Sequence, residues 1–173
     1  MTSKLTLLIM MAIALSACKT NSSHQQNEHS PSRFEKHMDA AGPITIDELQ
    51  SNYPIFSVKR HQELQLSAVE QLNAVTTPTQ IIAYFGTWCH DSQREIPNLI
   101  KLKKQLNNPN IQLQLIALDR NKSDSQGLAK KAKVKYTPTI VVYQNQEEKG
   151  RIVESTSEPI EVELLNIIES SSD

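Results

Sequence analysis

The apolar run from Ile81 to Phe85 is the sequence feature that most constrains the fold. Five consecutive apolar residues, IIAYF, are followed at once by Gly86. A continuous run of this length next to a turn residue is typical of a strand that is buried on both faces of a sheet. A helical pattern begins only a few residues later, near Cys89. We therefore expect a buried strand that leads through a short turn into a helix, as in an α/β protein.

The rest of the chain predicts further alternation of helices and strands. Helices are expected at four places: His61–Val75, Cys89–Leu106, Ser125–Lys133, and a last one whose first turn contains Pro159. Strands are expected at Gln80–Phe85 and Ile111–Leu118, and a hairpin at 139–143 and 151–154 with a seven-residue polar turn ending at Gly150. The segment 44–58 has no assignable pattern. We expect a central mixed sheet flanked by helices on both faces, with a C-terminal β-hairpin and helix.

The N-terminus has the pattern of an export signal. Lys4 precedes an apolar run of about a dozen residues, and Ser16 and Ala17 stand before Cys18. The run is too short to span about 30 Å of hydrocarbon. Residues 19–33 are polar and lack apolar periodicity, so they are expected to form a flexible tether.

The sequence Leu15-Ser16-Ala17-Cys18 resembles the lipobox of bacterial lipoproteins. This resemblance implies that residues 1–17 are a signal peptide and that Cys18 carries several acyl chains. The residues after the tether, 34–173, are expected to form one domain. Several chains suffice for stable anchoring. Lys19 favours the outer membrane, with the domain facing the periplasm. The alternative is an ordinary signal peptide with an incidental cysteine.

Composition excludes several classes of protein. The 18 basic and 19 acidic residues give a net charge of −1, which provides no overall field to attract nucleic acid. Two cysteines exclude both a disulfide-rich miniprotein and a four-thiolate zinc site. No metal site or cofactor is expected, since Cys89, His90 and Asp91 are adjacent and diverge around a helical turn.

The residues around Cys89 resemble the active-site turn of the thioredoxin superfamily. A Trp precedes the cysteine, giving Trp88-Cys89-His90-Asp91-Ser92. Pro97 lies where that family kinks its active-site helix, and Thr137-Pro138 stands just before an apolar strand, where the family has a cis proline. The resemblance covers approximately residues 44–170. It implies a thioredoxin-like α/β fold.

The same resemblance implies roles for individual residues. Cys89 would be the nucleophile, with Ser92 and Pro138 beside it, and a helix N-terminus favours its thiolate form. Trp88, Thr137 and Pro138 would hold an extended peptide. A protonated His90 would favour the thiolate, whereas the charge of Asp91 would oppose it.

Three positions depart from the family pattern. Ser92 stands where dithiol enzymes have a second cysteine, and a lipidated Cys18 is no substitute, so an internal disulfide cycle is excluded. Ala83 stands where thioredoxins have a buried aspartate. Glu154 stands where they have a glycine, and its carboxylate either assists proton movement or is simply solvated.

Three roles for Cys89 follow. It is a monothiol exchange catalyst whose mixed disulfide is released by an external thiol, an incidental residue of a non-catalytic peptide-binding module, or a small residue at a helix start. The first predicts an oxidoreductase- or isomerase-type enzyme. Its partners would be thiol- or disulfide-bearing envelope proteins or small thiols such as glutathione, with the membrane contacted through Cys18.

Overall fold

A five-stranded mixed sheet forms the centre of the molecule. The computed structural model describes residues 38–57 and 63–170. The strands are β1 (Gly42–Ile44), β2 (Thr79–Phe85), β3 (Ile111–Ala117), β4 (Thr139–Gln144) and β5 (Glu147–Val153). Their order is β1-β3-β2-β4-β5, with β2 and β3 parallel and the other neighbours antiparallel. The apolar run that predicted a central strand therefore lies in the middle of the sheet, as expected.

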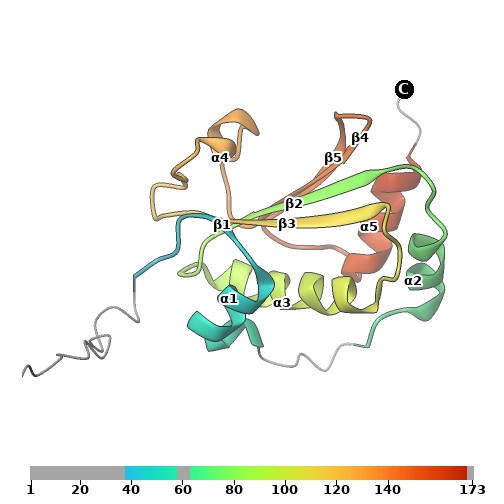
Figure 1. Ribbon diagram of the computed structural model, residues 1–173, viewed down its shortest axis with the longest axis horizontal. Coiled ribbons are helices and arrows are strands. Elements are labelled where there is room, and N and C mark those ends of the chain that lie inside the picture. Colours follow the sequence, from blue (N-terminus) through green and yellow to red (C-terminus); the bar gives the residue numbers. More distant parts are fainter. Residues whose placement is uncertain (1–37, 58–62, 171–173) are drawn as a thin grey trace, which may run out of the picture.

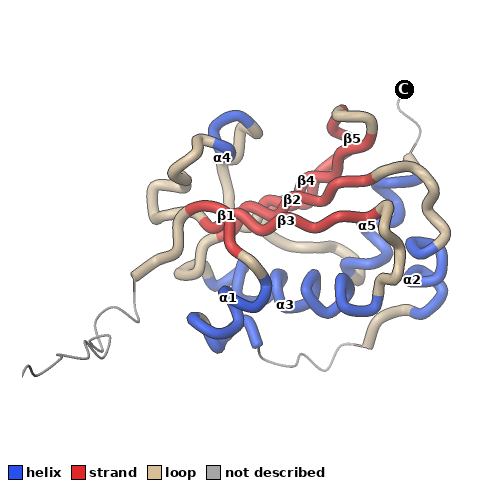
Figure 2. Tube along the Cα trace, viewed as in Figure 1, coloured by secondary structure: helices blue, strands red, loops and turns tan. Residues whose placement is uncertain are grey.

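Helices cover the two faces of the sheet unequally (Figures 1 and 2). The helical elements are α1 (Ile46–Asn52), the 3-10 turn η2 (Pro54–Ser57), α2 (Leu66–Asn73), α3 (His90–Gln105), α4 (Leu128–Lys131) and α5 (Ile160–Glu169). One face packs against α1, α2, α3 and α5 in the larger core, which includes Leu49, Leu72, Ile96 and Leu164. The other face carries a smaller core of Tyr84, Ile116, Leu118, Ala129 and Val141, covered by α4 and its flanking loops.

Local sequence explains where several elements begin. The side chain of Thr45 accepts the backbone N–H of Glu48, whose carboxylate in turn accepts the N–H of Thr45, so a capping box starts α1. In β1, Pro43 is tolerated because this is an edge strand with one neighbour, β3. Neither α1 nor β1 was assigned from the sequence.

Four predicted boundaries are wrong. The helix expected over 61–75 is helical only at Leu66–Asn73, with His61 outside the described residues, and the one expected over 125–133 only at Leu128–Lys131. Pro159 is the N-cap of α5 rather than part of its first turn. The hairpin has a two-residue turn instead of the predicted seven-residue turn. Most of the polar residues assigned to that turn belong to the edge strand β5, where polar side chains can face solvent.

No helix in residues 38–57 and 63–170 is long and apolar enough to cross a membrane. The predicted signal peptide, the predicted lipidation site at Cys18 and the predicted tether all lie outside the described residues.

The β4–β5 turn gives a test of the corrected hairpin. Asn145 and Gln146 have φ of 52° and 69°, as a type I′ turn requires, and glycine is favoured at the second position. Gln146→Gly is expected to raise the free energy of unfolding by about 0.5–1 kcal/mol, since a side chain in left-handed backbone costs more than glycine's extra chain entropy. Denaturant unfolding measures this change. The control Gln144→Gly, inside β4, is expected to lower stability; a loss in both variants would contradict the turn assignment.

Candidate functional site

Cys89 occupies the N-cap of α3, at the carboxyl end of the central strand. Its backbone is extended (φ −85°, ψ 125°), and its N–H donates to the carbonyl of Gly86 at 3.0 Å. The side chain of Cys89 is half-buried. The short turn from strand to helix therefore places the thiol where the first free amides of α3 point. This agrees with the position predicted for the helix start.

Two opposing effects act on the thiol. Burial of the sulfur raises the pKa of Cys89, but hydrogen bonds with the Thr137 side chain, with the N–H and hydroxyl of Ser92, and with the N–H of Asp91 outweigh it. The pKa of Cys89 therefore lies below its ordinary value. The thiol also lies 3.1 Å from the carbonyl of Thr137, to which it donates while protonated. That contact favours the thiol form, so the lowering comes from the other hydrogen bonds.

Ser92 is placed to stabilise a thiolate. Its side chain is fully buried, and its oxygen accepts the N–H of Gly86 at 3.2 Å. With that lone pair occupied, the hydroxyl proton is free to point to the Cys89 sulfur, consistent with the lowered pKa. A serine here supports the nucleophile by a hydrogen bond and cannot form a disulfide with it.

Trp88 is fixed on three sides. Its indole Nε1 donates to the carbonyl of Leu118 at 3.0 Å, and its ring lies against the Cα of Gly86, where an added Cβ would be 2.6 Å from Cε2. The guanidinium of Arg120 lies 5.6 Å from the ring centroid and forms an ion pair with Asp39 at 2.7 Å. The aromatic surface beside the thiol is therefore held rigidly. The contributions of Arg120 and Asp39 were not predicted, because 81 residues separate the pair in sequence.

The loop facing the sulfur contains the predicted cis proline. The Thr137–Pro138 peptide bond is cis, and both residues are buried. The hydroxyl of Thr139 donates to the carbonyl of Tyr136 at 2.8 Å, and the N–H of Glu154 donates to that of Pro138 at the same distance. Glu154 has φ of 65°, a left-handed backbone that suits the glycine found here in the resembling family, and its side chain is exposed. The loop is thus held from both sides.

The charged residues of the first turn of α3 form a chain of contacts. Asp91 lies 2.7 Å from Arg94, which also contacts the buried carboxylate of Glu95 at 2.8 Å, while His90 is exposed. Arg94 therefore offsets the charge of Asp91, which by itself would oppose a thiolate. The i,i+3 spacing of Asp91 and Arg94 in the sequence is the signal that predicts this contact.

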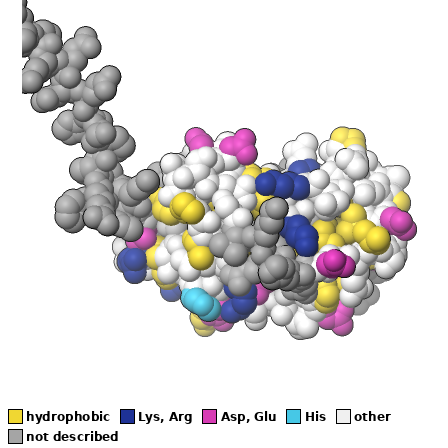
Figure 3. Space-filling view, turned by 90° about the horizontal axis from the view of Figure 1, so that it is seen from below, with side chains coloured by type: hydrophobic (Ala, Val, Ile, Leu, Met, Phe, Trp, Pro, Cys, Tyr) yellow, Lys and Arg dark blue, Asp and Glu magenta, His cyan; other side chains and the backbone are white. Residues whose placement is uncertain are grey.

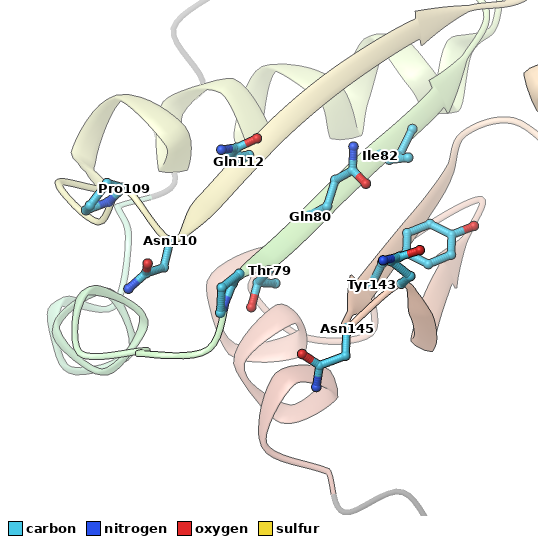
Figure 4. Close-up of a pocket in the computed structure, with 10 residues that line it drawn as sticks. Thr79, Gln80, Ile82, Pro109, Asn110, Gln112, Tyr143 and Asn145 are labelled. Carbon is cyan, nitrogen blue, oxygen red and sulfur yellow. The ribbon is translucent and has the colours of Figure 1, made fainter.

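Other expected features also have defined places. Ala83 is fully buried in β2, so this strand position holds a methyl group and no carboxylate. In residues 38–57 and 63–170, no three His, Cys, Asp or Glu side chains are grouped as metal ligands would be. A hollow of about 760 Å³, lined by polar residues such as Gln80, Asn110 and Gln112, lies at the amino ends of β2 and β3, the end of the sheet away from Cys89 (Figure 4).

Removal of the Ser92 hydroxyl tests the hydrogen bond to the sulfur. Ser92→Ala is expected to raise the pKa of Cys89, so that alkylation by iodoacetamide at neutral pH slows several-fold, because a hydrogen bond to a charged group is lost. The pH dependence of the alkylation rate measures the change. Ser67→Ala, on α2, is the control and should leave the profile unaltered. An unchanged profile in Ser92→Ala would contradict the assigned role.

The close contact at Gly86 gives a second test, since Trp88 is the sole tryptophan. Gly86→Ala places a methyl group against the indole, so we expect shifted tryptophan emission and a loss of about 1–3 kcal/mol in unfolding free energy. Gly127→Ala is the control: its φ of 68° is strained for alanine, but no atom lies within 4 Å of the added Cβ. It should lose stability without altering native emission. Unshifted emission in Gly86→Ala would contradict the contact.

Comparison with known proteins identifies the family of this chain. A thioredoxin family model matches residues 47–163. A search of curated proteins gave no match. Similar solved structures include a protein of unknown function from Pseudomonas aeruginosa (20% identity, 71% of this chain, 78% of that chain, TM-score 0.49). Another is thioredoxin-2 of a malaria parasite, a component of its protein secretion machinery (24% identity, 55% of this chain, 84% of that chain, TM-score 0.44). A third is oxidised thioredoxin O2 of Arabidopsis thaliana (15% identity, 58% of this chain, 82% of that chain, TM-score 0.39). Since the family model covers well over half of the chain, the protein belongs to the thioredoxin family.

Proposed function

We propose that this protein is a cell-envelope thioredoxin-like oxidoreductase that performs monothiol thiol–disulfide exchange through Cys89. The observation that carries this proposal is the sulfur itself: it is half-exposed at the start of α3, and hydrogen bonds lower its pKa despite its partial burial. Membership of the family supports a general thioredoxin-type redox role.

The proposed reaction has two exchange steps. The Cys89 thiolate attacks a disulfide, forming a mixed disulfide and releasing the other sulfur of the substrate as a thiolate. A second thiol, either from the substrate or from a small molecule such as glutathione, then attacks the mixed disulfide and regenerates Cys89. Each step forms one S–S bond and breaks one, so no further oxidant or reductant is consumed. Ser92 holds the thiolate by a hydrogen bond, while the Trp88 ring and the Thr137–Pro138 loop flank the substrate chain.

A non-catalytic peptide-binding module is the second candidate. The rigid Trp88 ring and the buried cis proline beside it favour a peptide site whether or not Cys89 reacts. In that case the thiol would be incidental and peptide capture would survive its removal.

The location of the domain is part of the proposal. The export pattern ending at Cys18 supports an acylated N-terminus, a tether over 18–33 and a domain facing the periplasm from the outer membrane. An envelope setting supplies proteins with disulfides, which are the substrates the reaction needs.

The exchange reaction is tested with oxidised glutathione. The full chain carrying Cys18→Ser, with Cys89 as its sole thiol, is expected to gain one glutathionyl group by mass spectrometry and to lose it in excess reduced glutathione. Cys89→Ala in the same background is the control and should gain none. Absence of an adduct, together with peptide binding that persists in Cys89→Ala, would favour the binding module instead.

Restoring the second thiol tests the geometry. In the Cys18→Ser background, Ser92→Cys is expected to form an internal disulfide and to gain protein-disulfide reductase activity, because the new sulfur replaces a hydroxyl that already contacts Cys89. Insulin reduction measures the gain, and Ser67→Cys is the control, as it adds a thiol far from the site. A Ser92→Cys protein that forms no internal disulfide would contradict the proposed contact.

A further inference from the structure

The loop between β3 and β4 is strongly basic. We call this segment, residues 119–136, the basic lobe. It contains α4 and projects from the sheet on the face opposite α3 (Figure 1). Its six basic residues are Arg120, Lys122, Lys130, Lys131, Lys133 and Lys135, against the two acidic residues Asp119 and Asp124. The whole chain has a net charge of −1, so positive charge is concentrated in this lobe.

The two carboxylates of the basic lobe are directed to its own backbone. Asp124 accepts the N–H groups of Gln126, Leu128 and Ala129 and thereby fixes the start of α4. Asp119 accepts those of Asn121 and Ser123. These contacts shape the loop and leave the lysines to solvent.

Four lysines of the basic lobe are exposed: Lys130, Lys131, Lys133 and Lys135. Within the described part of the chain, no carboxylate lies within ion-pair distance of any of them. The helical side of the molecule is different, since basic and acidic side chains are interspersed there (Figure 3). The lobe is therefore a patch of one sign rather than part of an evenly mixed surface.

Both ends of the basic lobe lie against the Cys89 turn. At its start, Leu118 accepts the Trp88 indole N–H and Arg120 stacks on the same ring. At its end, the Thr137 carbonyl lies 3.1 Å from the Cys89 sulfur. A polypeptide that reaches the thiol between Trp88 and the Thr137–Pro138 loop therefore passes both ends of the lobe, with Arg120 at one end and Lys135, two residues before Thr137, at the other.

One exposed acidic residue lies beside the Thr137–Pro138 loop: Glu154, whose N–H donates to the carbonyl of Pro138. The basic lobe differs in that its exposed charges share one sign. A patch of one sign attracts an anionic segment and orients it.

Arg120 supplies a specific contact at the rim. Its side chain is 70% exposed, and its ion pair with Asp39 is made through Nε rather than through the two terminal nitrogens. A guanidinium end presents a fork that matches a carboxylate. The exposed ring of Tyr136 lies at the other end of the lobe and adds apolar contact area.

We propose that the basic lobe selects disulfide-bearing polypeptides with acidic residues close to the reactive cysteine, an inference that rests on the exchange reaction proposed above. The lobe is too large for glutathione alone, because four separate lysines spread over six residues exceed what a tripeptide with one net negative charge can engage. An extended acidic segment can contact several of them at once.

Two activated peptides test this selection. Each contains one cysteine protected as a 2-pyridyl disulfide, flanked either by aspartates and glutamates or by lysines. The Cys89 thiolate forms an S–S bond with the peptide sulfur, and the electron pair of the broken bond leaves on pyridinethiolate, which takes a proton from water. Both peptides release the same leaving group, so its absorbance measures the two reaction rates on the same scale.

At low salt, the full Cys18→Ser chain is expected to react about tenfold or more faster with the acidic peptide than with the basic one. The difference should shrink towards unity near 1 M salt, where the screening length is about 3 Å. Equal rates at low salt would overturn the proposed selection while leaving the exchange reaction intact. Lack of reaction with both peptides would instead contradict the exchange reaction.

Charge reversal locates the effect. Lys133→Glu with Lys135→Glu is expected to abolish the preference for the acidic peptide, with the alkylation rate of Cys89 by neutral iodoacetamide little changed. The matched control, Lys101→Glu with Lys104→Glu, makes the same change in net charge near the far end of α3. Lys104 is about 22 Å along the helix from Cys89. When the variants are compared at about 0.1 M salt, where the screening length is about 10 Å, the preference should therefore remain. Loss of preference in both variants would overturn the assignment to the basic lobe.

Anionic lipid is the competing occupant. Binding to vesicles of phosphatidylglycerol and phosphatidylethanolamine is measured with the same variants. If the lobe variant loses vesicle binding while the two peptides react equally with the parent chain, the lobe serves a membrane surface and the proposal is wrong.

Discussion

The position of β2 in the middle of the sheet is the constraint on which the site depends. This strand pairs along its whole length with β3 and along most of it with β4, so the end of β2 is fixed relative to the ends of both neighbours. At the carboxyl end of β2, the carbonyl of Phe85 accepts the N–H of Leu118 at 2.7 Å. The chain leaves β2 into the Cys89 turn, leaves β3 at Leu118 and enters β4 just after Pro138. Three distant segments therefore meet around one sulfur.

The chemistry of that sulfur is a balance between burial and hydrogen bonding. Partial burial disfavours a thiolate, and donors from Ser92, Asp91 and Thr137 stabilise it more strongly. Ser92 has a double effect in this balance: its oxygen is held by Gly86, which directs the hydroxyl towards Cys89, and it lacks the sulfur that would complete an internal disulfide. A protein built in this way is suited to form mixed disulfides and depends on another thiol to release them.

Sequence reasoning was strongest where one residue pattern determines one local structure. The IIAYF run identified the central strand, the pattern after Cys89 identified α3 nearly to its ends, and Thr137-Pro138 was correctly predicted to be cis. Prediction from sequence failed where the structure of a segment depends on the strands packed beside it. Polar residues of β5 were assigned to a turn, although their side chains are compatible with an edge strand.

The site itself was only partly predictable, for a similar reason. Its backbone positions follow from strand and helix order, so Cys89, Ser92 and Pro138 could be grouped in advance. The contacts that hold Trp88 could not, because they join residues remote in sequence: Arg120 reaches both the indole and Asp39, and Leu118 accepts the indole N–H. The one-sided charge of the basic lobe was hidden in a nearly neutral overall composition.

The central claim, that this fold stabilises the Cys89 thiolate, is tested most directly by titrating the thiol. The ultraviolet absorbance of the thiolate, followed against pH in the folded Cys18→Ser chain and in the same chain unfolded by denaturant, gives the two pKa values on one scale. Our account predicts a midpoint for the folded chain that lies below that of the unfolded chain. A folded midpoint equal to or above the unfolded one would mean that burial outweighs the hydrogen bonds, and it would contradict the account.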